Sequence, residues 1–214
     1  MSKPRLHIGD KNYSSWSMRP WLALRHGGIE FEEVLHELPE LGGKPSFGAF
    51  SPNARVPALE WDGVTIAESL SICEWAAEQS PSLWPKDAKA RALARTAASI
   101  MHSGFPHLRN DAPMNIRRRT DASRMTPDGL ADAQKVDQLW NDWLGRSGGP
   151  FLFGQWSIAD AMYAPVITRF VTYAIPRSAG AENYMQVMLA EPHLAAWIEA
   201  ANRETRRLPR SDIA

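Results

Sequence analysis

A short polar turn near the N-terminus carries side chains that are suited to holding an anion. Residues 12–17 read Asn-Tyr-Ser-Ser-Trp-Ser and follow a short apolar-alternating run, residues 5–8. An apolar-rich helical stretch begins at about Trp16 and continues to His26. The N-terminus of a helix presents unpaired N–H groups and a partial positive charge. Ser14 and Ser15 could therefore donate hydrogen bonds to an anion, and simple capping of the helix is the competing interpretation for each serine.

A second candidate segment is the pair Val56-Pro57, at the start of a predicted strand. Proline is unusual there because it has no N–H to donate to a sheet. A cis peptide bond between the two residues would explain it and would leave the backbone N–H and C=O of Val56 pointing at a ligand. A trans proline on an edge strand is the alternative.

The third candidate segment is Glu68-Ser69, where a strand gives way to a helix. Glu68 could bind an amino group, and the hydroxyl and N–H of Ser69 could bind a carboxylate. Capping of the following helix is again the simpler interpretation.

The elements that would position these segments alternate between short strands and helices. We expect strands at residues 5–8, 31–38, 56–61 and 64–66, and helices at 16–26 and 69–79, with a loop at 42–53 that has room for one short helix. Asp62-Gly63 is a strong two-residue hairpin signal. Gly27-Gly28 should stop the first helix, and Pro20 should lie near its first turn. The order β-α-β-loop-β-β-α predicts a small mixed sheet with helices on its faces.

Helical periodicity dominates after a linker at residues 81–85. Thr126-Pro127-Asp128 should begin a helix with a wide apolar stripe, and Gly148 should end it. Residues 157–160 resemble a capping box, residues 161–173 should form a buried central helix, and Glu191-Pro192 should open the last helix. The prediction is an α/β domain over residues 1–82 followed by an all-α helical bundle domain over residues 88–214.

Composition narrows the class of protein. The 214-residue chain is 44% apolar and 22% charged, with zero formal net charge, which predicts neither a nucleic-acid nor a membrane partner. No apolar run approaches the roughly 20 residues of a membrane helix, and the first residues lack the apolar core of a signal peptide. The single cysteine, Cys73, cannot form an internal disulfide, and no Cys/His pair has zinc-like spacing, so no metal is predicted. These features favour a reduced, cytoplasmic protein.

Taken together, the order and spacing of the three segments resemble the cytosolic glutathione transferases over nearly the whole chain. The resemblance implies a thioredoxin-like first domain, glutathione as co-substrate and a homodimer. It implies that Pro57 is cis, that Val56 pairs with the cysteinyl backbone of glutathione, and that Glu68 and Ser69 hold the γ-glutamyl end. Lys44 is assigned to glutathione binding on the same grounds.

The polar turn most resembles that of the zeta class, the maleylacetoacetate isomerases, which reads Ser-Ser-Cys-Ser-x-Arg. Here Trp16 replaces the cysteine in the run from Ser14 to Arg19. Transfer of glutathione to a small electrophile is the leading functional hypothesis. A glutathione-dependent isomerase and a non-catalytic interaction module that keeps the fold are the alternatives.

The chemistry such a site requires is the conversion of a thiol into a thiolate. A free cysteine thiol has a pKa of about 8.5, and each unit of depression requires about 1.4 kcal/mol. One hydroxyl hydrogen bond to a charged sulfur supplies roughly 1.5–3 kcal/mol, and a helix N-terminus about 0.3–1 kcal/mol. Together they correspond to roughly one to three pKa units. Ser14 is the first candidate donor, Ser15 the second and Tyr13 the third.

The same turn argues against a thioredoxin-like redox enzyme, which would carry a cysteine there. Cys73 lies within the helix at residues 69–79 and is expected to be a small buried core residue.

A second substrate should be bound with help from the helical part. Gly104 and Pro106 interrupt the helical pattern at residues 101–110. We expect His102 and Arg109 from this segment, together with Trp16, to bind a small electrophilic or acidic substrate. Surface or interhelical polar contacts are the competing interpretation.

Overall fold

A four-stranded mixed sheet forms the base of the molecule in the computed structural model, which describes residues 3–39 and 46–211. The strands are β1 (Arg5–Gly9), β2 (Glu32–His36), β3 (Ala58–Trp61) and β4 (Val64–Ile66). Their order is β2-β1-β3-β4, with β1 parallel to β2 and antiparallel to β3, and β3 antiparallel to β4. Asp62 and Gly63 join the last two strands with φ angles of 43° and 81°, as the hairpin signal predicts.

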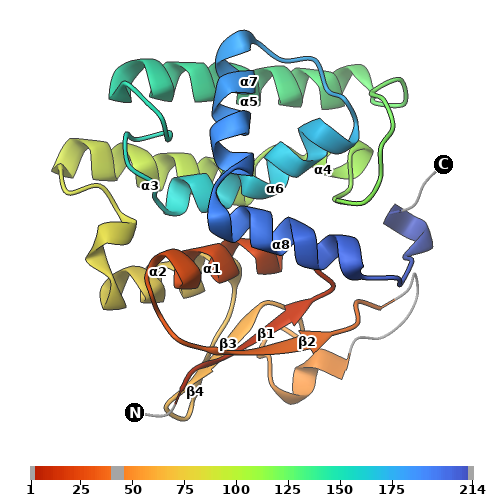
Figure 1. The fold of residues 1–214 in the computed structure, drawn as a ribbon. Helices are drawn as coiled ribbons and strands as arrows, with labels where there is room; N and C mark the ends of the chain where they lie inside the picture. Colours follow the sequence, from red (N-terminus) through yellow and green to blue (C-terminus); the bar gives the residue numbers. More distant parts are fainter. Residues whose placement is uncertain (1–2, 40–45, 212–214) are drawn as a thin grey trace.

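The sheet has a different cover on each face. Helices α1 (Ser15–His26) and α2 (Ser69–Gln79) lie between the sheet and the rest of the helices (Figure 1). Leu6 and Ile8 of β1 are fully buried. His7, between them, must point to the opposite face, where its ring stacks on Phe50 at 4.1 Å between centroids. Phe50 follows the 3₁₀ turn η1 (Ser46–Ala49), which therefore lies on that face.

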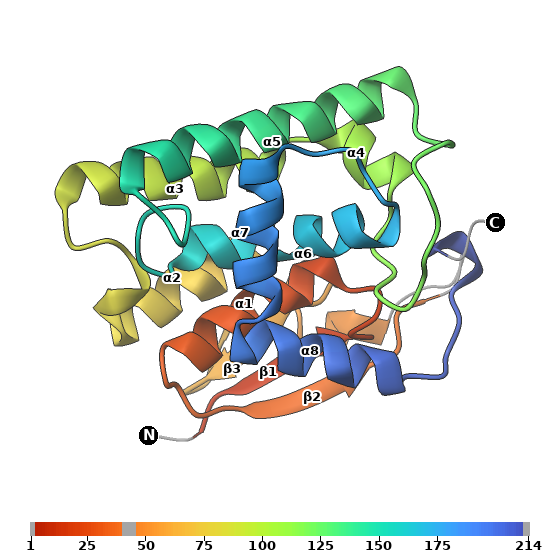
Figure 2. The same ribbon diagram turned by 45° about the horizontal axis from the view of Figure 1, so that its top comes forward.

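The remainder of the described chain consists mainly of helices. After the 3₁₀ turn η2 (Pro81–Leu83) come α3 (Ala88–Ser103), α4 (Pro106–Asp111), α5 (Pro127–Ser147), α6 (Ile158–Thr172), α7 (Ala179–Leu189), α8 (Pro192–Arg203) and the 3₁₀ turn η3 (Pro209–Ser211). Figures 1 and 2 show α6 in the middle of this bundle, with α1 on one side of it and α5 on the other. The predicted fold class, an α/β domain followed by an all-α domain, is confirmed. No helix within the described ranges is both long and apolar enough to cross a bilayer.

Helix α6 is the buried centre of the helical domain, as its sequence predicts. Asp160 near its start is fully buried and accepts from the backbone N–H of Leu152 at 3.0 Å and of Ser157 at 2.9 Å. The Ser157 and Tyr184 hydroxyls donate to the same carboxylate at 3.2 and 3.0 Å. The predicted capping box is therefore present, and it also fastens the preceding loop and α7 to α6.

Most of the other predicted boundaries agree with the structure. Thr126 caps α5 and Gly148 follows it with φ of 80°, while Glu191 caps α8. Cys73 is fully buried, as expected of a core residue.

Three expectations need correction. β2 is shorter than predicted, because residues on either side of Glu32–His36 do not pair with β1. β3 begins at Ala58 rather than Val56, since Pro57 has no N–H for the ladder. Helix α1 begins at Ser15, so Pro20 lies in the second turn and removes one hydrogen bond of the helix interior.

Candidate functional site

Two pockets meet where the N-terminal domain faces the helical domain. The first, of about 200 Å³, is lined by Trp16, Asn53, Arg55, Val56, Pro57, Glu68, Ser69 and His102. The second, of about 430 Å³, is lined by Tyr13, Ser14, Ser15, Trp16, Leu38, Val56, Arg109, Asn110, Pro113, Met114, Arg169 and Ser211. Trp16 and Val56 line both, so the two pockets are neighbours. A larger pocket of about 600 Å³, around Trp84 and Trp156, contains none of the predicted site residues.

The first pocket is built on the loop that precedes β3. The Val56–Pro57 peptide bond is cis, as predicted, and Val56 is buried. Because the strand begins only at Ala58, the backbone of Val56 is outside the β3 ladder, and Val56 lines the pocket.

Glu68 and Ser69, at the N-terminus of α2, also line this pocket. Glu68 occupies the N-cap position, yet its side chain makes no capping hydrogen bond. Its Oε2 instead lies 3.3 Å from Nε2 of His102 and accepts a long hydrogen bond of 3.5 Å from the Ser69 hydroxyl. The competing interpretation, capping of α2 by the Glu68 side chain, therefore does not account for this residue.

Ser14 is the N-cap of α1 and also part of a chain of hydroxyl groups. Its Oγ accepts from the Ser17 N–H at 3.4 Å and donates to Ser17 Oγ at 2.7 Å. Ser17 Oγ in turn accepts from the backbone N–H of Gly9 at 3.1 Å. Capping is thus confirmed for Ser14, which also lines the second pocket.

Ser15 lies beside a buried cation. Nη2 of Arg169, on α6, donates to Ser15 Oγ at 3.4 Å. The same guanidinium is anchored by donation to the carbonyls of Ala112 at 2.8 Å and Pro165 at 2.9 Å. Arg169 therefore lies at a fixed position next to the predicted serines.

Arg169 belongs to a group of three arginines beside Ser15 and Trp16, which we call the arginine cluster: the buried Arg19 and Arg169 and the half-buried Arg109. The guanidinium carbons of Arg19 and Arg109 lie 4.2 and 4.9 Å from the centroid of the Trp16 ring. Nη1 and Nη2 of Arg19 are buried with no hydrogen-bond partner among the described residues.

The arginines of the cluster donate to backbone carbonyls, and burial and mutual repulsion lower their pKa values. Burial, followed by the charges of Arg109 and Arg169, lowers the pKa of Arg19 well below its ordinary value. Burial, and then the charge of Arg109, lowers the pKa of Arg169 to about 9. That value still leaves Arg169 cationic at neutral pH. The second pocket is therefore a site of positive potential that favours an anion.

Sequence reasoning missed Arg19 and Arg169 as site residues. Both lie in helical stretches that are otherwise apolar and buried, where an arginine is rare unless it has a partner or a ligand. An arginine within an otherwise apolar helix was therefore the signal available in the sequence. It does not reveal that Arg19 and Arg169 lie near each other.

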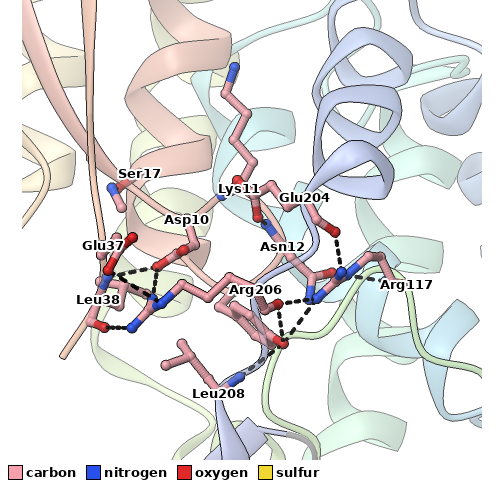
Figure 3. A network of polar contacts seen from close by, with 12 residues as sticks. Asp10, Lys11, Asn12, Ser17, Glu37, Leu38, Arg117, Glu204, Arg206 and Leu208 are labelled. Atoms are coloured by element: carbon pink, nitrogen blue, oxygen red, sulfur yellow. Dashed lines mark hydrogen bonds and ion pairs between the residues drawn. The ribbon is translucent and has the colours of Figure 1, made fainter. Parts of the chain in front are cut away.

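Tyr13, the third candidate donor, is engaged by the C-terminal segment. Its hydroxyl accepts from the Leu208 N–H and from Nη2 of Arg117, both at 3.2 Å, and donates to the Arg206 carbonyl at 3.4 Å. Figure 3 shows the surrounding network, in which Arg206 bonds Asp10 at 2.8 Å and the Leu38 carbonyl at 2.6 Å. These contacts hold the C-terminal segment along the rim of the second pocket, where Ser211 lies.

The predicted second-substrate residues do not share one pocket. His102 lines the first pocket, facing Glu68, whereas Arg109 lines the second. Both still contact Trp16, His102 in an edge-on ring contact at 5.4 Å. Lys44 falls outside the described residues.

Known proteins with the same combination of domains are similar to this chain along most of its length. Residues 13–79 match the family model "Glutathione S-transferase, N-terminal domain", and residues 124–200 match "Glutathione S-transferase, C-terminal domain". Maleylacetoacetate isomerase of Rattus norvegicus is 37% identical over 182 residues, 82% of either chain. Glutathione S-transferase L3 of Arabidopsis thaliana is 29% identical over 193 residues, 88% of this chain and 74% of the relative.

A solved structure shares the fold as well. A glutathione transferase homologue from Burkholderia, crystallised with bound glutathione, superposes with a TM-score of 0.74 at 23% identity and covers 95% of this chain and 100% of its own. Both family models match in the expected order, and the rat relative is 37% identical over 82% of either chain. The chain is therefore a member of the glutathione S-transferase family, an enzyme family that includes the maleylacetoacetate isomerases.

Proposed function

We propose that the protein transfers glutathione to a small electrophile and that the two adjoining pockets bind the two substrates. The observation that carries this proposal is the position of Ser14 and Ser15. Both line the second pocket at the N-terminus of α1, beside the two residues, Val56 and Trp16, that also line the first. A thiol delivered along Val56 would meet hydroxyl donors and an electrophile at that junction.

Glutathione occupies the first pocket in this proposal. The Val56 backbone pairs with its cysteinyl unit, while Glu68 receives the ammonium of the γ-glutamyl end and Ser69 its carboxylate. Supporting this, the Glu68 side chain is not used as a helix cap and faces the pocket. Lys44 remains a predicted further contact. Relatives of similar fold bind glutathione, the Burkholderia homologue among them.

Activation of the thiol rests on the hydroxyl chain that ends at Ser14. In the structure the Ser14 hydroxyl donates to Ser17 Oγ. If that hydrogen turns to the sulfur instead, Ser14 Oγ still accepts from the Ser17 N–H and Ser17 Oγ still accepts from the Gly9 N–H. Hydrogen bonds in such a chain polarise one another. The positive potential of the arginine cluster favours the thiolate in the same direction.

The reaction needs no catalytic base on the protein. The bound thiol loses its proton to solvent, and the thiolate sulfur donates an electron pair to the electrophilic carbon, forming a C–S bond. In a substitution, the leaving group departs with the electron pair of the bond it breaks. In an addition to an activated double bond, the resulting carbanion takes a proton from water.

Binding of glutathione is the direct test. The protein should be retained on immobilised glutathione, and ultraviolet difference absorption should detect bound thiolate at neutral pH. Absence of binding at millimolar glutathione would refute the proposal and favour an interaction module that keeps only the fold. A panel of electrophiles that includes a maleyl compound separates transfer from isomerisation, the second candidate, for which the rat relative's name is the supporting observation.

We further propose that the second substrate is an acid, because Arg109 and Arg169 line the second pocket and no acidic residue is among its described lining residues. Arg109→Gln should lower kcat/KM about tenfold for an electrophile carrying a carboxylate and leave its neutral amide analogue nearly unchanged, since one charge-assisted hydrogen bond contributes about 1.5–3 kcal/mol. Paired steady-state kinetics on the two substrates provide the measurement. Arg203→Gln, on an exposed arginine, is the matched control. Equal losses on both electrophiles would contradict an acid-binding role.

His102 should behave differently, since it faces Glu68 in the first pocket. Its replacement by alanine should alter the KM for glutathione more than that for the electrophile.

A homodimer, a cytoplasmic location and domain boundaries near residues 82 and 88 remain predictions. Light scattering measures the oligomeric state, and limited proteolysis locates the domain boundaries.

A further inference from the structure

Three side chains with metal-binding atoms meet far from the proposed catalytic site. They are His26, the last residue of α1, Glu191, the N-cap of α8, and His193, in the first turn of α8. Their ligand atoms all lie within 4.8 Å of one another. Figure 2 shows the beginning of α8 beside the end of α1, which is what brings these residues together. A helix rises about 1.5 Å per residue, so the cluster lies about 17 Å along α1 from Ser15.

We propose that His26, Glu191 and His193 form a binding site for a divalent first-row transition ion, with zinc chemistry, that links the N-terminal domain to the helical domain. Two imidazoles and one carboxylate are the protein ligands of zinc sites that keep a fourth position for water. Because the cluster is remote from Ser14 and from the first pocket, the ion would stabilise the contact between the two domains and would take no part in the transfer reaction. The proposal does not depend on the glutathione chemistry.

Two of the three ligands are already held in place. Oε1 of Glu191 accepts from the His193 N–H at 2.9 Å and lies 3.1 Å from Nε2 of His26, while Oε2 accepts from the Leu194 N–H at 2.7 Å. Each carboxylate oxygen has two lone pairs, so these bonds leave capacity for a metal. The His26 ring is stacked on Trp156 with centroids 3.4 Å apart, which fixes its orientation.

His193 is the ligand that must adjust. Its ring meets His26 edge-on at 4.8 Å between centroids. Tetrahedral ligands at about 2.0–2.2 Å from zinc lie about 3.4 Å from one another, so the largest separation must shorten by roughly 1.5 Å. Rotation of the His193 side chain about its own bonds can supply that movement without moving the helix.

Solvent reaches the cluster from one side. His26 and Trp156 line the pocket of about 600 Å³ that Trp84 also lines. This pocket provides an entry path for the ion and room for the water that would complete its coordination, both of which a metal site requires.

Metal titration of the intact protein tests the proposal. After treatment with a chelator, the protein should bind one Zn²⁺ with a Kd of about 10 μM or tighter by calorimetry, and Co²⁺ should give the visible d–d bands of a four-coordinate site. A hundredfold excess of Zn²⁺ over Kd should raise Tm by about 5–10 °C.

Two variants separate the site from adventitious binding. His193→Ala should weaken binding at least tenfold, as should Glu191→Ser, which keeps a side chain able to cap α8. His107→Ala, on an exposed histidine of α4, should bind as the unmodified protein does. The proposal is wrong if Zn²⁺ binds no more tightly than about 100 μM, or if both variants keep the unmodified affinity, measured on samples whose metal-free Tm matches the parent.

Discussion

Replacing Ser14 by alanine is expected to raise the pKa of the enzyme-bound glutathione thiol by about 1–2 units and to lower kcat/KM roughly 10–100-fold at pH 6.5, because one hydroxyl hydrogen bond to a thiolate contributes about 1.5–3 kcal/mol. The affinity for glutathione itself should change little, since the proposed binding groups are Val56, Glu68 and Ser69 in the other pocket. The measurements are the ultraviolet titration of bound thiolate and the pH dependence of kcat/KM.

The matched controls lie in the same turn. Ser17→Ala removes the residue that positions Ser14 through the 2.7 Å bond, and it should produce a smaller shift of the same sign. Ser15→Ala removes the hydroxyl that contacts Arg169 but leaves the Ser14–Ser17 chain intact. An unchanged thiolate pKa in Ser14→Ala, with a raised one in Ser15→Ala, would transfer the role to Ser15 and its neighbouring arginine.

The second large effect concerns stability rather than catalysis. Asp160→Ala should reduce the free energy of unfolding by about 3–5 kcal/mol, because it leaves buried donors unsatisfied and opens a cavity at the start of α6. The donors are the N–H groups of Leu152 and Ser157 and the hydroxyls of Ser157 and Tyr184. Urea unfolding followed by circular dichroism measures the loss.

An exposed acid of the same kind supplies the control for this variant. Asp128 lies in the first turn of α5 and is exposed, so Asp128→Ala should cost only about 0.3–1 kcal/mol through the helix dipole. Similar losses of unfolding free energy for the two variants would show that the capping box contributes no more to stability than an exposed acid in the first turn of a helix.

The stability contribution of Asp160 should also depend on pH in a defined direction. Burial raises the pKa of this carboxyl to about 6 in the folded protein, from an ordinary value of 3.8. The folded state therefore holds the proton more tightly than the unfolded state. The resulting stabilisation is fully present below about pH 4 and is lost as the pH rises through 6, a change of about 3 kcal/mol. The stability of the unmodified protein relative to Asp160→Asn should accordingly fall between pH 4 and 6; a difference that rises with pH would contradict the raised pKa.

Local signals in the sequence determined much of the fold. Gly148, Asp62-Gly63 and the run from Ser157 to Asp160 are short patterns whose geometry depends on neighbouring residues, and each has the predicted conformation. The proline at position 57 left a cis and a trans bond open, and the resemblance to the glutathione transferases implied the cis bond that the structure has. These inferences needed no knowledge of distant contacts.

Only the tertiary structure decided which side chains share a pocket. Arg19, Arg109 and Arg169 come from three different helices, and no spacing along the chain indicates that they meet beside Ser15 and Trp16. His102 was placed with Arg109 because they are neighbours in sequence, yet the break at Gly104 and Phe105 leaves His102 at the end of α3 and Arg109 on α4, where they line different pockets.

The cluster of His26, Glu191 and His193 shows the same limit, because it exists only where α8 begins beside the end of α1. Sequence determines secondary structure, caps and turns through interactions that extend over a few residues. The net charge of a site and the set of ligands it offers depend on residues that are distant in sequence and that packing brings together. For this protein the turn at Ser14 could therefore be identified from the sequence, whereas the positive pocket beside it could not.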